Sequence, residues 1–231
     1  MKPLETSLNT AVIKKNGQEI DALGDEHVGT SKDTPMLPNA FDLSEEEKMT
    51  KIKYHFAEIM STLGLDLSDD SLSGTPARVA KMYVKEIFQG LNPINKPEIK
   101  LFENKYQYNE MLVERDITVH SHCEHHFVPI IGKAHVAYIS NGFVIGLSKI
   151  NRIVRHFSKR PQVQERLTEQ IADELKRVLK TDDVALVIDA SHMCVSTRGI
   201  EDTASSTVTA HYSGKFKDEN TKKEFLQHIK S

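Results

Sequence analysis

Two short segments contain both cysteines of the chain, each close to histidine, and they limit what this sequence can fold into. Residues 118–129 read Thr-Val-His-Ser-His-Cys-Glu-His-His-Phe-Val-Pro and contain Cys123 and four of the chain's 11 histidines. Residues 191–194 read Ser-His-Met-Cys, with His192 two positions before Cys194. Thiolate and imidazole groups are the usual ligands of zinc. We therefore expect a fold that brings these two distant segments to one metal ion.

The spacing within each segment suggests how a shared site is made. Cys123 and His126 are three residues apart, so a turn or helical start directs both at one ion, and in a strand His192 and Cys194 share a face. Three ligands leave a fourth position for a water that can act as a nucleophile. Spacing alone does not choose between Cys123, His126 and Cys194 and a set that uses His125 or His192. Histidines near strand ends also commonly bind nothing.

The composition excludes several other classes of protein. Hydrophobic residues make up 39% and charged residues 27% of the 231 residues, ordinary values for a globular protein. The net charge of −3 argues against a surface that coats nucleic acid. Apolar runs are shorter than the roughly 20 residues that cross a bilayer, and the first residues lack a signal-peptide core. Two cysteines beside histidines suit a reducing compartment. We expect a cytoplasmic protein with no nucleic-acid or membrane partner.

The chain is expected to consist of a tail and one catalytic domain. Residues 1–43 mix charges with glycine and proline without periodicity, which predicts a flexible tail. The domain at 44–231 is expected to contain a helical pair at 44–92 and a mixed part at 110–231.

Local signals define the two helices of the pair. Ser44 and Glu47 form a capping box that opens the first helix, and Gly64 suits its end. Thr75, followed by proline, is expected as the N-cap of the second helix, which ends near Gly90. The short polar link between them predicts an antiparallel pair.

The remaining pattern alternates between strands and helices. Period-two segments and apolar runs predict strands at about 112–119, 133–139, 143–146, 184–188 (extending toward Cys194) and 206–212. Helical periodicity predicts helices at 147–158, from Pro161 to about 180, and at 217–229. This order predicts a compact α+β domain.

A basic stripe on the 147–158 helix indicates an anion site. Its residues lie opposite the apolar face: Lys149, Arg152, Arg155 and Lys159. Such a stripe is equally typical of a solvated helix face. Ser148 stands at the helix start, where free N–H groups attract anions, and Arg198 could add a charge-assisted contact.

Gln164 and Glu165 follow Pro161 in the first turn of the next predicted helix. Their simpler role is a favourable interaction with the helix dipole. Their functional role would be to accept N–H groups from the edge of a purine.

Five separated motifs, in this order, resemble the GTP cyclohydrolase I family, and the resemblance covers about residues 44–230. They are Thr75-Pro76-Ala77-Arg78-Val79-Ala80, Cys123-Glu124-His125-His126-Phe127, Gly146 through Arg152, Arg160 through Leu167, and His192-Met193-Cys194 through Ile200. Both cysteine positions of the zinc-dependent class are filled. The resemblance implies a hydrolase acting on cyclic amidine C–N bonds. It would convert GTP and water to 7,8-dihydroneopterin triphosphate and formate, the first step of folate or tetrahydropterin synthesis.

The resemblance also implies which residues do the chemistry. One zinc ion per subunit would be held by Cys123, His126 and Cys194 and would activate the water that attacks C8 of guanine. His125 would protonate N7. His192, with Ser148 nearby, would transfer protons in the later rearrangement, for which the pKa of histidine is suitable.

Substrate contacts follow from the same motifs. Glu165, helped by Gln164, matches the guanine anchor, because a carboxylate accepts both N1–H and the 2-amino group. The triphosphate clamp matches five basic residues: Lys149, Arg152, Arg198, and, as assistants, Arg78 and Lys81. Arg155 and Lys159 match no role.

The implied architecture is the tunnelling fold, an antiparallel sheet with two helices packed on it, preceded by the helical pair. The resemblance also implies a homodecamer of two pentamers with active sites at subunit boundaries, and in some relatives an N-terminal extension regulates the enzyme. His120 and His122 match no family role and are expected to be bystanders on a strand.

Three rival interpretations share part of this pattern. A zinc nucleoside deaminase needs His-x-Glu and Pro-Cys-x-x-Cys, and the sequence has neither. A non-catalytic zinc-stabilised nucleotide-binding protein would not need His125 and His192 together with Glu165. Another tunnelling-fold pterin enzyme is disfavoured by the Cys-Glu-His-His motif.

Overall fold

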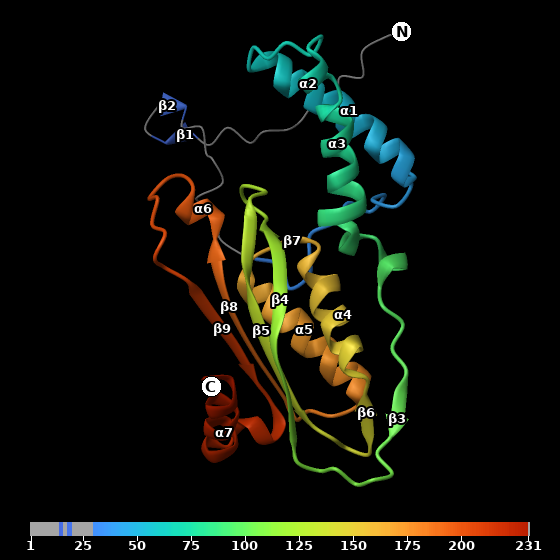
Figure 1. The fold of residues 1–231 in the computed structure, drawn as a ribbon, viewed down its shortest axis with the longest axis vertical. Helices are drawn as coiled ribbons and strands as arrows, with labels where there is room; N and C mark the ends of the chain where they lie inside the picture. Colours follow the sequence, from blue (N-terminus) through green and yellow to red (C-terminus); the bar gives the residue numbers. More distant parts are fainter. Residues whose placement is uncertain (1–13, 16–17, 20–29, 231) are drawn as a thin grey trace. The chain divides into compact units, whose positions relative to one another are not determined.

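The computed structural model in Figure 1 describes residues 14–15, 18–19 and 30–230. By its internal contacts the chain divides into a unit of residues 1–31 and a unit of residues 32–231. The described part of the first unit is a pair of antiparallel two-residue strands, β1 (Lys14–Lys15) and β2 (Gln18–Glu19). Most of the tail predicted at 1–43 lies outside the described residues, and from Lys32 onward the chain belongs to the second unit.

The first helix of the predicted pair is α1 (Glu45–Thr62), and its capping box is confirmed. The Glu47 backbone N–H donates to Ser44 Oγ over 3.2 Å, and the Ser44 N–H donates to Glu47 Oε2 over 2.8 Å. These bonds satisfy backbone donors that a helix start leaves without a partner. Gly64 follows the helix with a φ of 82°, a conformation that glycine adopts without strain.

The second helix of the pair is less regular than predicted. A short helix, α2 (Asp70–Ser73), precedes α3 (Thr75–Lys81), and Gly74 rather than Thr75 is the N-cap. After Lys81 the chain continues as a π-helical turn, η1 (Met82–Ile87), and two 3-10 turns, η2 (Gln89–Leu91) and η3 (Pro93–Asn95). Periodicity does not separate α from π winding here, because a single π-helical turn is too short to change the apolar pattern of the whole segment. α3 packs against α1.

The central element is a five-stranded sheet with the order β7-β4-β5-β8-β9. Its strands are β4 (Met111–Cys123), β5 (Pro129–Ile139), β7 (Pro161–Gln162), β8 (Val184–His192) and β9 (Thr207–Tyr212). All neighbours are antiparallel except the short edge strand β7, which is parallel to β4. The α+β class with an antiparallel sheet is confirmed.

The two faces of the sheet carry separate cores. Val136 and Tyr138 of β5 point into the larger core, which α4 (Leu147–Ser158) and α5 (Gln164–Leu179) cover. Ala137 and Ile139 point the other way, into a smaller core. Helix α7 (Glu219–Lys230) and the turn η4 (Gly214–Lys217) close that face (Figure 1). Alternation along β5 thus buries both faces, as expected for a strand with helices on either side.

Three local predictions differ from the structure. Pro161 lies in β7 rather than at the start of a helix, and proline is tolerated there because β7 is an edge strand. β6 (Phe143–Ile145) pairs with an unpredicted strand, β3 (Leu101–Glu103). β8 ends at His192, and Cys194 lies on the helical turn α6 (Met193–Ser196) rather than on a strand.

No helix within the described ranges is long and apolar enough to cross a membrane.

Candidate metal centre and active site

The turn of residues 123–127 connects β4 to β5 and supplies the first half of the site. The Phe127 N–H donates to the Cys123 carbonyl, and the Cys123 N–H donates to the Val128 carbonyl, both over 2.9 Å. Phe127 has a φ of 55°, which reverses the chain tightly. Cys123 is buried, whereas His125 and His126 are exposed. The turn therefore presents two histidines beside a buried sulfur.

The second half lies where β8 passes into α6. His192 is the last residue of β8 and pairs with Ile130 at the start of β5, while His122 of β4 pairs with Pro129. Because β5 lies between β4 and β8, these pairings bring the ends of both strands to one end of the sheet (Figure 1). Cys194 follows directly on the helical turn.

Cys123, His126 and Cys194 form a group that could hold a metal ion. Their ligand atoms all lie within 4.8 Å of one another. Zinc binds sulfur at about 2.3 Å and nitrogen at about 2.0 Å in a tetrahedron, so ligand atoms at these separations fit one ion. Burial raises the pKa of the Cys194 thiol, and the nearby Cys123 raises it further. A dication would favour the thiolate form of both.

Two further contacts surround the imidazoles of the turn. Nδ1 of His125 lies 3.6 Å from the Cys123 sulfur, so His125 sits at the edge of the metal group. The Arg198 guanidinium donates to Nε2 of His126 over 2.8 Å. A metal on either ring nitrogen of His126 would end this bond, because Nε2 would then carry the metal or the proton.

Two anchors hold the turn against the rest of the domain. The buried Arg166 guanidinium of α5 makes a two-pronged ion pair with Glu124, whose second contact, Nη2 to Oε1, measures 3.2 Å. The Glu124 N–H donates to the Gln162 carbonyl over 3.0 Å. On the other side, the Phe127 ring packs edge-on against Phe88, with centroids 5.0 Å apart. The turn is exposed but is fixed to two different elements.

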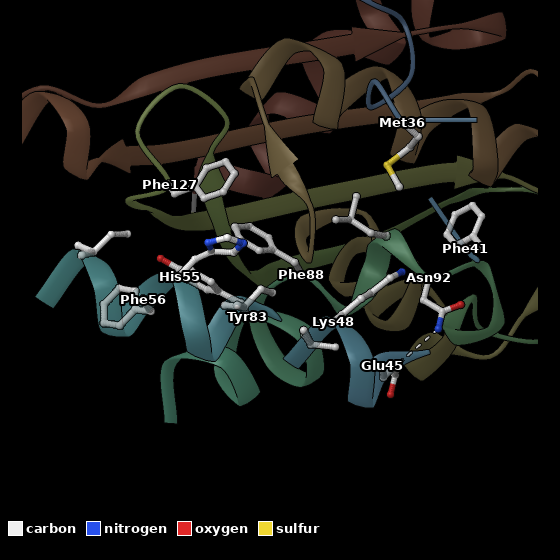
Figure 2. Close-up of a pocket in the computed structure, with 14 residues that line it drawn as sticks. Met36, Phe41, Glu45, Lys48, His55, Phe56, Tyr83, Phe88, Asn92 and Phe127 are labelled. Carbon is white, nitrogen blue, oxygen red and sulfur yellow. Dashed lines mark hydrogen bonds between the residues drawn. The ribbon is translucent and has the colours of Figure 1, made fainter. Parts of the chain in front are cut away.

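Phe127 lines a cavity of about 380 Å³, and Figure 2 draws the residues that surround it. Its wall is largely apolar and comes from residues 36–41, α1, η1 and the turn. Phe127 is the one member of the turn that faces it, and none of the predicted site residues lines it. This cavity is therefore distinct from the metal group, although both share the turn.

His192 is held by a buried glutamine. Its Nε2 lies 2.8 Å from Oε1 of Gln164, a side chain that is 1% exposed at the start of α5. Burial lowers the pKa of His192, and the nearby Glu165 carboxylate opposes this shift. Glu165 itself is exposed.

The sequence predicted a substrate contact for Gln164, yet the hydrogen bonds of its side chain in the structure are to protein groups. Hydrogen bonds between a buried side chain and distant elements, such as the bond from Gln164 to His192, have no signature in a single sequence.

The structure places the first residues of α4 away from this end of the sheet. α4 follows β6 beyond the far end of β5, and its last residues lie near β7, which pairs with Cys123. Twelve residues at 1.5 Å each make α4 about 18 Å long, so Ser148 and Lys149 lie well away from the metal group. Lys149 Nζ donates to the Glu98 carbonyl over 2.9 Å.

Among the described residues, the other predicted phosphate contacts, Arg198 excepted, make no hydrogen bond or ion pair with the metal group. Arg152 is exposed on α4, and Lys81 is exposed at the end of α3. Arg78 donates to Thr75 Oγ1 over 2.9 Å, close to its own helix start. Arg198 is the predicted phosphate contact that touches the metal group.

The two histidines without a predicted role differ from each other. His120 is exposed on β4. His122 packs on the Phe88 ring with centroids 5.5 Å apart, and burial lowers its pKa. Neither belongs to the metal group.

Sequence comparisons with known proteins point to one enzyme family. A sequence model of the family described as GTP cyclohydrolase I matches residues 52–230. A Flavobacterium johnsoniae protein named GTP cyclohydrolase 1 is 60% identical over 215 residues, covering 93% of this chain and 96% of that protein. Proteins of the same name from Vibrio parahaemolyticus and Salmonella gallinarum are 55% identical over 199 residues and 52% identical over 214 residues. These alignments cover 86% and 92% of this chain and 91% and 96% of the relatives.

Proposed function

The chain belongs to the GTP cyclohydrolase I family, and from this premise we propose that it converts GTP and water to 7,8-dihydroneopterin triphosphate and formate. This reaction is the entry step of folate or tetrahydropterin synthesis. The observation that carries the proposal is the group of Cys123, His126 and Cys194, assembled from two distant segments within 4.8 Å. The α+β fold, with two helices on an antiparallel sheet, is the tunnelling fold of that family.

Zinc is the metal proposed for the group, one ion per chain. Two thiolates and one imidazole form a donor set that zinc prefers, and three protein ligands leave an open position. A zinc ion bound there would supply Lewis-acid activation of water for attack at C8 of guanine. Calcium and magnesium would be disfavoured, since both prefer oxygen ligands.

Two histidines are proposed to move protons at the substrate. His125 is exposed beside the Cys123 sulfur, a position that supports protonation of guanine N7. His192 is half-buried and held at Nε2, which supports proton transfer during ribose opening and ring closure. Ser148 is proposed to assist His192.

Recognition of GTP is proposed to divide between a carboxylate and a set of cations. Glu165 is exposed at the first turn of α5 next to the buried Gln164, where it could accept the N1–H and 2-amino hydrogens that adenine lacks. The cations proposed for the triphosphate are Lys149, Arg152 and Arg198, with Arg78 and Lys81 assisting. Arg198 already contacts His126 of the metal group.

The separation of the start of α4, with Ser148 and Lys149, from the metal group supports active sites built from more than one chain. The phosphate-binding residues of α4 would then reach the metal group of a neighbouring subunit. We propose a homodecamer of two pentamers with active sites at subunit boundaries, as the family resemblance implies.

An assay of both products tests the reaction. Metal-loaded protein is incubated with GTP, and formate and the fluorescence of oxidised neopterin are measured. Both products are expected in equal amounts. Absence of both, with one metal per chain and the oligomer intact, would overturn the enzyme proposal and leave a metal-stabilised nucleotide-binding protein.

A mixing experiment tests the shared sites. Cys194→Ala and Lys149→Ala chains are each expected to be inactive, whereas co-expressed mixtures should regain activity because some sites combine intact halves. A mixture of Cys123→Ala and Cys194→Ala, which damages the same half twice, is the matched control and should stay inactive. No recovery in the first mixture would contradict shared sites.

A further inference from the structure

Gln164 is almost fully buried, and its amide hydrogens are bonded to other groups of the protein. Its Nε2 donates to the carbonyls of Ile188 and Thr207 over 3.1 and 2.8 Å. Both carbonyl oxygens can only accept, so the atom that faces them must be the nitrogen. The oxygen Oε1 therefore faces the opposite way, toward His192.

A chain of hydroxyl groups fixes the same orientation independently. Thr168 Oγ1 donates to the Gln164 carbonyl over 2.9 Å, so its hydrogen is committed there. Thr209 Oγ1 lies 2.7 Å from Thr168 Oγ1 and must be the donor in that contact. Thr209 therefore offers only lone pairs to Gln164 Nε2, which lies 3.1 Å away. Reversing the amide would place two acceptors against each other at three points.

The orientation of the amide determines where His192 carries its proton. Oε1 of Gln164 is an acceptor and lies 2.8 Å from His192 Nε2, so this nitrogen must be a donor. Neutral imidazole has one N–H, which leaves the lone pair on Nδ1. Within residues 30–230 the structure gives Nδ1 no hydrogen bond, so it is the nitrogen open to a ligand.

We propose that Gln164 is a positioning residue that holds His192 in the Nε2–H form, so that Nδ1 exchanges protons with the substrate. This inference rests on the proposed function, in which His192 transfers protons, and it replaces the predicted guanine contact of Gln164. Hydrogen bonds to the second ring nitrogen set tautomer and ring orientation in other histidine sites in the same way.

Nitrogen NMR tests the proton position without any substitution at Gln164. The metal-loaded protein is labelled with 15N-histidine, and the His192 signals are identified by their loss in His192→Gln. A two-bond proton–nitrogen spectrum is expected to show protonated Nε2 and unprotonated Nδ1 above the pKa of the ring. A proton on Nδ1 would overturn the inference even if the protein converts GTP, and the Nε2–H form would stand even if it does not.

Kinetics of matched variants test whether this position matters. Gln164→Met keeps the volume and removes the amide, whereas Gln170→Met removes another buried glutamine amide of α5, one bonded to Gln162 rather than to His192. We expect Gln164→Met to lower kcat about 10- to 100-fold with KM for GTP and metal content nearly unchanged. Gln170→Met should retain kcat at a similar loss of Tm. A raised KM with unchanged kcat in Gln164→Met would instead indicate a guanine contact and would overturn the proposal.

Discussion

The turn at 123–127 contributes Cys123 and two histidines, and the junction of β8 with α6 contributes His192 and Cys194, but the two segments hold their histidines in different ways. His125 and His126 project from an exposed reversal of the chain, where Arg198 contacts His126 and the Cys123 sulfur lies beside His125. His192 ends a central strand and is fixed by a buried amide. One half of the site is therefore accessible and the other is set by the core.

This difference suggests a division of labour. Exposed imidazoles can turn toward a metal or a substrate, because little protein packs around them. A histidine held at one nitrogen keeps its remaining nitrogen in one place, as proton transfer requires. Four predictions test this division.

The largest effect is expected where both halves meet at the metal. Cys194→Ala and Cys123→Ala should each lose the metal and all measurable turnover, because two remaining ligands hold zinc poorly. Metal per chain, measured by elemental analysis after gel filtration, checks this. If Cys194→Ala kept one metal per chain, α6 would not belong to the site.

The next effect separates ligands from proton carriers. His125→Ala and His192→Ala should keep the metal and lose about 100-fold or more in kcat, the usual contribution of a general acid or base. His126→Ala should lose the metal. Loss of metal from His125→Ala with retention in His126→Ala would reverse the ligand assignment in the turn.

A smaller effect is expected from the anchor of the turn. Arg166→Met removes the ion pair with the half-buried Glu124 and should cost about 2 kcal/mol of unfolding free energy, with faster loss of metal to a chelator. Arg177→Met, also on α5, removes one of two cations that contact the buried Glu174, and because Lys96 still pairs with that carboxylate the cost should be smaller than for Arg166→Met. Equal stability and chelation rates in the two variants would show that the turn does not depend on Arg166.

The smallest effect is expected on the exposed side of the same hairpin. Lys133 on β5 pairs with Asp116 on β4 over 2.8 Å, with both side chains more than half exposed. Lys133→Ala should leave the denaturant midpoint of unfolding and the metal content nearly unchanged, because an ion pair between exposed side chains contributes little. Denaturant unfolding checks this, and a large loss would mean that the hairpin is held more by its surface than by its core.

Local chemistry made much of the fold predictable from the sequence. The capping box at Ser44 and the amphipathic stripe of α4 are set by neighbouring residues, so they appear in the structure as predicted. The π-turn after Lys81 and the pairing of β6 with β3 depend on distant packing, and periodicity does not report it.

The candidate site was predictable in part for the same reason. Two cysteines with histidine neighbours are visible in a sequence, and the structure brings Cys123, His126 and Cys194 together. The bond between Gln164 and His192 joins α5 to β8. A glutamine in a sequence does not show whether its amide will be buried or which group it will contact, so this bond could not be predicted. The catalytic and substrate roles remain predictions that the experiments above test.

The position of β5 between β4 and β8 has a consequence for how the protein folds. The ends of β4 and β8 meet only when both strands pair with β5 in the observed register. A one-residue slip of β8 would move Cys194 by about 3.4 Å and turn His192 to the opposite face. Because these contacts join distant parts of the chain, they form late and slowly. Capture of the metal during refolding should therefore trail the recovery of strand structure, and a chain that retains metal will be one whose three central strands are correctly aligned.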